Sequence, residues 1–396
     1  MHTMKSASAI PRGVWVLGFV SLLMDISSEM IHSLLPLYLT VGLGASALAV
    51  GMIEGIAEAT ALVVKVFSGT LSDRWRKRKA ITAFGYGLAA FSKPLFALAS
   101  GPMLVFFARF LDRIGKGIRG APRDALIADL TPKEIRGAAF GLRQSLDTVG
   151  AFAGPLLAMA LMLAWNDDFR AVFWVAVVPA MLSFLLVVFA VKEPAQAPAA
   201  PNAEKVRLDR ATLGRLGPAF WGVSAAAMAM TLARFSEAFL ILRGADLGMH
   251  AAYAPLILVG MNVVYAATAY PVGRLADRMS RRTLLFIGIA FLVAADVVLA
   301  MAAGLVALGA GIALWGLHMG FTQGVFAAMV AQASSAPLRG TAFGVFNLAS
   351  GVAMLVASAL AGALWQFVGP GAAFVAGAVL AALSFLITVF VIRRSP

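Results

Sequence analysis

Long apolar segments follow one another along almost the whole chain, and they constrain its fold more than any other feature. A helix that crosses a bilayer needs about 20 predominantly apolar residues. Of the 396 residues, 61% are hydrophobic and 13% are charged, which is too little polar surface for a soluble protein of this length. The sequence therefore predicts an all-α membrane protein. The twelve predicted transmembrane helices are 14–39, 45–69, 80–99, 102–123, 137–163, 170–191, 218–242, 252–273, 283–302, 306–331, 340–365 and 371–392.

Basic residues concentrate in the segments that would lie on one side of the membrane. They are dense in 74–79, 116–136, 192–215 and 274–282, whereas the predicted loops near 43, 101, 304 and 368 carry none. By the positive-inside rule, the basic side is cytoplasmic. We therefore expect a multi-pass protein of a bacterial-type inner (plasma) membrane with both termini in the cytoplasm. The same placement argues against nucleic acid as the partner of the net charge of +13.

Several classes of protein are disfavoured by what the sequence lacks. There is no cysteine, which excludes disulfides, thiolate metal sites and cysteine nucleophiles. No Gly-x-x-x-x-Gly-Lys-Ser/Thr loop is present, which argues against an ATP-driven pump. The charges are scattered rather than gathered into a catalytic set, so we expect neither an enzyme nor a cofactor. The residues before Pro11 are too few and too polar for a cleavable signal, so the first span is expected to remain.

The chain divides into two related halves. Residues 192–216 form the one linker-like segment, with three prolines and several charges. Ile135-Arg-Gly-Ala-Ala-Phe-Gly141 recurs as Leu338-Arg-Gly-Thr-Ala-Phe-Gly344, and Ser28-Glu29 recurs as Ser236-Glu237 at nearly the same separation. An internal repeat of this kind is typical of secondary transporters. We therefore predict a six-helix bundle over 1–191, a cytoplasmic linker over 192–216 and a second six-helix bundle over 217–396.

A basic loop motif occurs once in each half. Gly69-Thr-Leu-Ser-Asp-Arg-Trp-Arg-Lys-Arg-Lys79 matches Gly273-Arg-Leu-Ala-Asp-Arg-Met-Ser-Arg-Arg-Thr283. Both copies resemble the loop Gly-x-Leu-Ala-Asp-Arg-x-Gly-Arg-Lys of the major facilitator superfamily, departing from it where Arg76 and Ser280 replace the inner glycine. The resemblance implies two pseudo-symmetric six-helix bundles that alternate between inward-open and outward-open states. It also implies a gating role for Gly69, Asp73, Arg74, Gly273, Asp277 and Arg278.

Two further stretches resemble the drug/proton antiporters of this superfamily. In the fifth span, Gly141, Gly150 and Gly154-Pro155 match the first part of their glycine pattern, although the Gly-Gly that follows is missing. Small residues at this spacing allow a close helix crossing, and packing alone would also explain them. In the fourth span, Arg113 to Gly117 matches their Arg-x-x-Gln-Gly motif, except that Lys116 replaces the glutamine.

Ionisable residues at mid-span depth are the candidate functional groups, because each costs about 2.5–3.5 kcal/mol to insert. Asp25 and Glu29 lie one helical turn apart in the first span. They repel each other in a low dielectric, so we expect one of them to take up a proton in the physiological range. The residues assigned to proton coupling are Asp25, Glu29, Glu54, Glu58, Arg113 and Asp147.

Other interpretations of these charges stay open. Arg143 with Asp147, Glu58 with Lys65, and Arg234 with Glu237 could instead be internal ion pairs. Asp25, Glu29 and His32 supply donors that could hold a divalent cation, although no His-Glu-x-x-His pattern is present. The basic, glycine-rich stretch 115–124 could form a cradle for an anionic group.

These patterns favour a proton-coupled secondary transporter, a monomer in the lipid bilayer, that exports small amphipathic or toxic compounds. The alternatives are transport of a small organic or phosphorylated anion and, less favoured, of a divalent metal ion. Aromatic and amide side chains of the second half would contact the small-molecule substrate. The residues assigned to substrate binding are His32, Tyr265, Trp315, His318, Phe321, Gln323, Phe346 and Asn347.

The topology can be tested with single cysteines, since the chain contains none of its own. A cysteine at Ser100 should react with an impermeant thiol reagent from outside the cell, and a cysteine at Ala197 only from the cytoplasm. Reaction of both from the same side would contradict the twelve-helix topology.

Overall fold

The protein, seen in a computed structural model that describes residues 10–75, 77–193, 213–275, 279–335 and 338–393, is built of helices, with no strand in those ranges. The first half contains α1 (Arg12–His32), α2 (Leu35–Leu37), the π-helical turn η1 (Tyr38–Gly42), α3 (Ala47–Trp75), α4 (Arg78–Leu98), α5 (Pro102–Leu130), η2 (Lys133–Ile135), α6 (Arg136–Ala164) and α7 (Phe169–Ala190). The second contains α9 (Gly217–Ala233), α10 (Ala238–Asp246), η3 (Ala251–Tyr253), α11 (Pro255–Leu275), α12 (Arg281–Ala300), α13 (Leu305–Ala333), α14 (Arg339–Phe367) and α15 (Pro370–Arg393).

Eleven helical segments of the described chain are long and apolar enough to cross a membrane, and they correspond to eleven of the predicted spans. The predicted fourth span corresponds to α5, whose middle turns carry Arg109, Asp112, Arg113, Lys116 and Arg119 and are too charged for that set. The all-helical membrane fold is therefore confirmed, while the crossing of the membrane by α5 stays a prediction.

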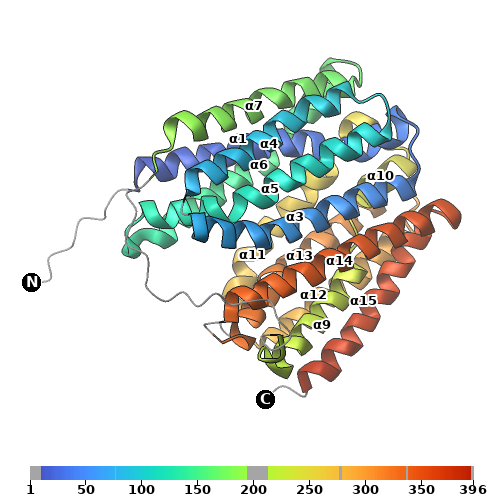
Figure 1. The fold of residues 1–396 in the computed structure, drawn as a ribbon. Coiled ribbons are helices and arrows are strands. Elements are labelled where there is room, and N and C mark those ends of the chain that lie inside the picture. The colour runs from blue at the N-terminus through green and yellow to red at the C-terminus, as the bar shows by residue number, and fades with distance from the viewer. Residues whose placement is uncertain (1–9, 76, 194–212, 276–278, 336–337, 394–396) are drawn as a thin grey trace, which may run out of the picture.

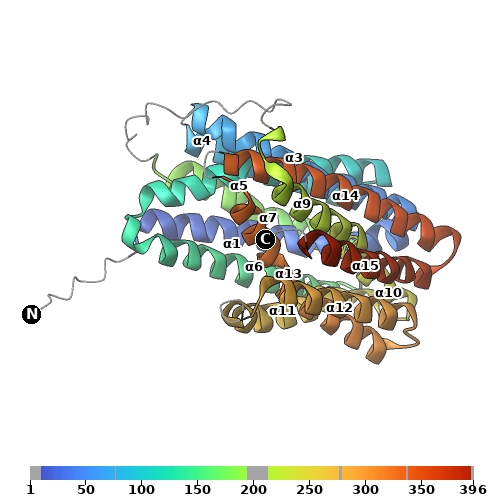
Figure 2. The same cartoon turned by 90° about the horizontal axis from the view of Figure 1, so that it is seen from below.

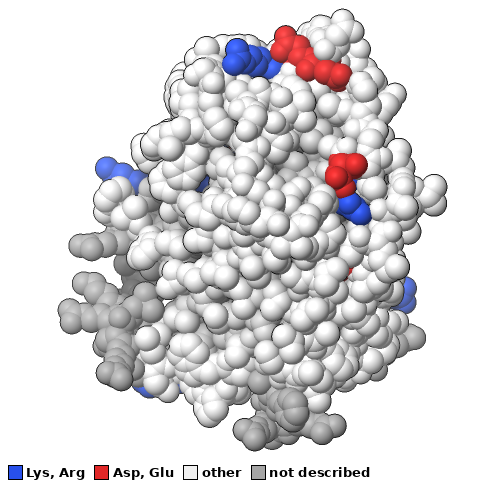
Figure 3. Space-filling view, turned by 90° about the vertical axis from the view of Figure 1, so that its right-hand side faces the viewer, with Lys and Arg blue, Asp and Glu red and all other residues white. Residues whose placement is uncertain are grey.

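The helices of each half lie largely together (Figure 1), with α1 to α7 in the upper part and α11 to α15 in the lower part, while the short α10 lies at the right beside the first half. The beginning of α1 and the end of α15 lie toward the same side of the molecule (Figure 1). The opposite end carries few charged side chains, and two small groups of adjacent acidic and basic residues stand out on it (Figure 3). The predicted bundle boundaries at 191 and 217 stay a prediction, since residues 194–212 lie outside the described ranges.

The two halves meet along α3 and α14, which lie side by side (Figure 2). A Cβ atom on Gly51 would lie 2.2 Å from the carbonyl oxygen of Ser358, and one on Gly55 3.1 Å from the Cα of Leu355. A second contact joins α6 to α11. At the end away from the termini, α2 contacts α10 and η3 contacts α6, and His250 Nε2 lies 3.2 Å from Asp167 Oδ2. The halves are therefore in contact at that end.

Glycines of α6 bring this helix close to α1, as their spacing predicted. A Cβ atom on Gly150 would lie 2.9 Å from the Cβ of Asp25, and one on Gly154 2.9 Å from the Cβ of Glu29. Larger residues at either position would push the helices apart. The position of both carboxylates therefore depends on this crossing.

Two predicted helices are interrupted, which corrects the sequence prediction of continuous helices over 14–39 and 218–242. The first ends at His32, two turns of different type follow, and Pro36 stands in the first turn of α2. Proline has no amide hydrogen and its ring crowds the preceding turn, which favours an interruption here, although Pro94 and Pro155 lie inside continuous helices. The second stops at Ala233 and resumes at Ala238, and within this break the amide of Ser236 donates to Ser358 Oγ at 3.2 Å.

The packing of α5 on α4 can be tested with two glycine-to-alanine changes in one helix. In Gly115→Ala, the added Cβ would meet the carbonyl oxygen of Gly85 at 2.6 Å, whereas in the control Gly120→Ala it meets nothing within 4 Å. Overpacking costs about 1–3 kcal/mol, while alanine in place of an unconstrained helical glycine gains up to ~1 kcal/mol. Gly115→Ala should lower the melting temperature of the purified protein and Gly120→Ala should not. Equal melting temperatures for the two variants would contradict this close contact.

Candidate functional site

A polar cavity of about 290 Å³ lies where the two halves meet. Helices α1, α3, α5 and α6 line it from the first half, and the break between α9 and α10 lines it from the second, together with α11 and α14. Its lining residues are Glu29, His32, Glu54, Glu58, Arg113, Lys116, Ala151, Arg234, Phe235, Ser236, Glu237, Asn262 and Met354. The break between α9 and α10 thus places a run of four residues, 234–237, at this cavity.

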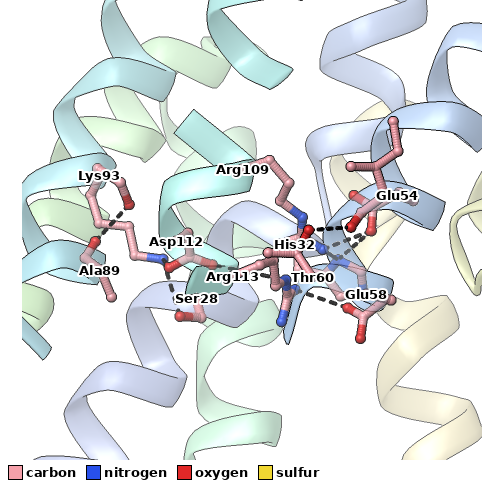
Figure 4. Close-up of polar contacts among 12 residues, drawn as sticks. Ser28, His32, Glu54, Glu58, Thr60, Ala89, Lys93, Arg109, Asp112 and Arg113 are labelled. Atoms are coloured by element: carbon pink, nitrogen blue, oxygen red, sulfur yellow. Dashed lines mark hydrogen bonds and ion pairs between the residues drawn. The ribbon is translucent and has the colours of Figure 1, made fainter. Parts of the chain in front are cut away.

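Arg109 of α5 is fixed behind the cavity by two lining residues (Figure 4). Its Nη2 donates to Glu54 Oε2 and to His32 Nδ1, each at 2.7 Å. The side chains of Arg109 and Glu54 are both only 1% exposed. A buried pair of this kind is costly to break, because either partner alone would be an uncompensated charge. This cluster therefore holds α1, α3 and α5 together.

Two more ion pairs extend this network along α5 (Figure 4). Glu58 Oε1 lies 3.4 Å from Arg113 Nη2. Lys93 Nζ of α4 lies 2.8 Å from Asp112 Oδ1 and donates to Ser28 Oγ at 3.1 Å. Sequence reasoning missed Lys93, although a lysine in the middle of an apolar span was a sufficient signal.

Glu29, Lys116, Arg234 and Glu237 line the cavity without a fixed counter-ion. Within the described parts of the chain, no ion pair shorter than 4.0 Å and no side-chain hydrogen bond involves any of the four. They interact electrostatically. The charge of Glu237 lies within electrostatic reach of the charge of Arg234 and, across the cavity, of the charges of Glu29 and Lys116. Each half therefore contributes one carboxylate and one cation that are available to a ligand.

Asp25 does not line this cavity, although its Cβ, like that of Glu29, lies against a glycine of α6. It is partly buried and lies within electrostatic reach of Asp147, Arg119, Lys116 and Arg123. No ion pair within 4.0 Å joins it to another described residue. Asp25 and Glu29 therefore both lie against α6, but only Glu29 lines the cavity.

The three proposed internal ion pairs have different outcomes. Arg143 Nη2 lies 3.0 Å from Asp147 Oδ2, which confirms that pair. The pairing of Glu58 with Lys65 is wrong, because the partner of Glu58 comes from the neighbouring helix α5. Arg234 and Glu237 are not joined within 4.0 Å, because the helix is broken between them and both face the cavity.

A second cavity of about 200 Å³ adjoins the first and shares Arg234 and Met354 with it. Three of the predicted substrate-binding residues line it, and a fourth, His32, lines the polar cavity. Its remaining lining is mostly apolar or carries hydroxyl groups. The full lining is Leu62, Ala227, Met230, Thr231, Arg234, Thr322, Gln323, Phe326, Phe346, Asn347, Ser350 and Met354.

The other four predicted substrate-binding residues lie outside both linings. Trp315 is fully buried and packs on Phe235, with ring centroids 5.6 Å apart. His318 is also fully buried and its Nδ1 lies 2.8 Å from the carbonyl oxygen of Gly288. Phe321 packs on the ring of Phe291, and Tyr265 packs on the hydrophobic core. Their contact with a substrate stays a prediction.

The predicted gating residues are described only in part. Gly69 lies in α3, where an added Cβ would meet that of Ala121 at 3.6 Å, and Gly273 lies in α11 with open space around it. The side chains of Asp73 and Arg74, and the whole of Asp277 and Arg278, lie outside the described parts of the structure.

Stretch 115–124 does not form a backbone cradle. It is continuous helix within α5, so its amide groups are engaged in helical hydrogen bonds. Its basic side chains make local contacts instead, since Arg119 lies over the ring of Tyr86 at 4.8 Å and Arg123 donates to Ser21 Oγ at 2.9 Å. The described residues also contain no group of three or more His, Asp or Glu arranged to hold a metal ion.

Comparison with known proteins points to one family. A model of the Major Facilitator Superfamily matches residues 17–242 and 221–396. An uncharacterized MFS-type transporter of Methanocaldococcus jannaschii is 33% identical over 395 residues, covering 96% of this chain and 95% of the relative. The multidrug resistance protein MdtH of Photorhabdus laumondii is 30% identical over 162 residues, which is 41% of this chain and 39% of that protein.

Solved structures share the fold at low sequence identity. The nucleoside transporter NupG has a TM-score of 0.73 at 13% identity, with 97% of this chain and 99% of that chain covered. A bacterial homolog of the human lysosomal transporter Spinster, in an inward-facing and occupied conformation, has a TM-score of 0.77 at 14% identity, with 96% of each chain covered. With the family match across the chain and the relative of similar length, these findings show that the protein belongs to the major facilitator superfamily.

Proposed function

We propose that the protein is a proton-coupled secondary active transporter that exports a small solute by alternating access. The observation that carries this proposal is the charged cavity between the halves, where Glu29 and Glu237 have no fixed counter-ion. Sites near the middle of the membrane between two repeats are where such transporters bind their substrates. A carboxylate there can exchange a proton when the cavity opens to either side.

The ion pairs separate the candidate proton sites into two groups. Glu54, Glu58 and Asp147 are each held by an arginine at 2.7 Å, 3.4 Å and 3.0 Å. Proton uptake by any of them would break an ion pair. Glu29 and Asp25 can change protonation without that cost, so we assign proton coupling first to Glu29 and second to Asp25. Arg113 would act by keeping Glu58 ionised.

Alternating access requires that the halves separate at one end while they meet at the other. At the end away from the termini the two halves are in contact, and Asp167 lies beside His250 there. Such contacts are expected of a conformation that is closed at that end. We propose twelve membrane-spanning helices in two bundles, 1–191 and 217–396, with both termini in the cytoplasm. In this arrangement the closed end faces outward, and we propose that the end of α3 with Asp73 and the matching segment with Asp277 close the other end.

The direction of transport and the substrate are inferred from sequence similarity. The similarity to MdtH covers less than half of either chain and supports export of small amphipathic or toxic compounds by proton antiport. A second candidate is transport of a small organic or phosphorylated anion, which Arg113, Lys116 and Arg234 favour. Transport of a divalent metal ion has no donor cluster to support it in the described residues.

A thermal-stabilisation screen of drugs, organic anions and amino acids would first identify the substrate. Proton coupling can then be tested with that substrate by comparing Glu29→Gln with Glu54→Gln. In inverted vesicles, Glu29→Gln should abolish accumulation driven by a pH gradient while exchange without a gradient survives. Glu54→Gln leaves Arg109 buried without its carboxylate, at a cost of about 3–5 kcal/mol, so it should lower the melting temperature strongly.

Two results would contradict this assignment. If Glu29→Gln still accumulates substrate on a pH gradient, and Asp25→Asn does so as well, the proton site lies elsewhere. If the folded fraction of Glu54→Gln binds substrate normally but has lost proton coupling, the paired carboxylate carries the proton.

A further inference from the structure

We infer that the cavity binds a small zwitterion, a molecule that carries a protonated amine and a carboxylate on a short frame with an uncharged side group. This inference rests on the proposed function and names the substrate class of the same cavity. Its basis is the balance of charges that remain in the lining once the internal ion pairs are formed.

Those internal pairs engage three of the seven acidic and basic lining residues, His32 not counted. Glu54 is bound to Arg109, and Glu58 is bound to Arg113. The charges left over are Glu29 and Lys116 on the first half, and Arg234 and Glu237 on the second. The cavity therefore offers two cations and two carboxylates, one of each sign on either side.

A ligand of a single sign would use only half of these groups. An anion would contact Lys116 and Arg234 and displace water from Glu29 and Glu237 without replacing it, and an organic cation would do the reverse. A charge that loses its water and gains no partner costs several kcal/mol. A ligand with one group of each sign replaces the lost water at both, and it can bridge the two halves.

The dimensions of the two cavities fit a ligand of the size of an amino acid. With about 30 Å³ for each water-sized group, the polar cavity of about 290 Å³ holds roughly ten such groups. The adjoining cavity of about 200 Å³ begins at Arg234 and has Phe346, Asn347 and Gln323 in its lining. It fits an apolar, aromatic or amide side group, with the charged head in the polar cavity.

This arrangement also gives a physical route to antiport. An ammonium group of the ligand and a proton would both neutralise Glu29, so each would weaken the binding of the other. By linkage, a ligand that is displaced by a proton displaces that proton in turn. Exchange of the two at one carboxylate is what an antiporter requires.

The test is equilibrium binding to the purified full-length protein in nanodiscs, with no pH gradient. The probes are matched triplets, such as L-phenylalanine, phenethylamine and 3-phenylpropionate, and L-leucine, 3-methylbutylamine and 4-methylpentanoate. The other amino acids with uncharged side chains complete the set, and the lipophilic cation tetraphenylphosphonium represents the drug class. We expect at least one zwitterion to bind at least about tenfold more tightly than its matched amine and acid, which corresponds to about 1.4 kcal/mol.

Variants of Arg234 connect that preference to the cavity. Arg234→Gln should weaken binding of the zwitterion about tenfold or more and leave binding of the matched amine nearly unchanged. Arg234→Lys keeps the charge and should keep the preference, which controls for misfolding. Arg12→Gln removes an exposed arginine outside both cavities and should bind like the unmodified protein.

The inference is overturned if no zwitterion in the set binds, if an amine, an acid or tetraphenylphosphonium binds more tightly than every zwitterion, or if Arg234→Gln weakens the zwitterion and its amine equally. Because no gradient is applied, failure of proton coupling would not affect these results. Conversely, a proton-driven transporter that binds no zwitterion would retain the proposed function and lose only this substrate class.

Discussion

The charges of α5 determine how the first half is assembled. A helix with Arg109, Asp112 and Arg113 within two turns cannot be surrounded by apolar neighbours, because an unpaired charge there is too costly. Its partners come from two different helices, Glu54 and Glu58 from α3 and Lys93 from α4. These pairs fix the rotation of three helices about their axes, so the polar side of the half faces the second half.

Once these pairs are formed, the cavity contains two kinds of charge with different tasks. The paired charges hold helices in place, and we propose that those without a fixed counter-ion bind a proton or a ligand. The close crossing of α1 and α6 also positions one of the unpaired charges. Gly154 packs against the Cβ of Glu29 and so determines how far this residue lies from α6. In this proposal the protein combines a framework of ion-paired helices with a small number of groups that exchange protons or ligand.

Most of the fold could be predicted from the sequence, because apolar length and basic loops report directly on membrane-spanning helices. The close crossing at Gly150 and Gly154 and the pair of Arg143 with Asp147 were also predictable from local spacing. The partner of Glu58 was not, since it comes from another helix and spacing along one helix cannot reveal it. The break at Arg234 was hidden for a similar reason, because Ser358, which receives the amide of Ser236, is distant in the sequence.

The interruption between α9 and α10 has a consequence for selectivity. Arg234 and Glu237 stand on backbone that is not locked into a continuous helix, while Glu29 and Lys116 stand on unbroken helices. A molecule held between the two sets would also set the torsion angles of residues 234–237, and with them the angle between α9 and α10. Recognition and movement would then depend on the same four residues. A variant that stiffens this connection would trade speed of turnover for discrimination among substrates, and a looser one would do the opposite.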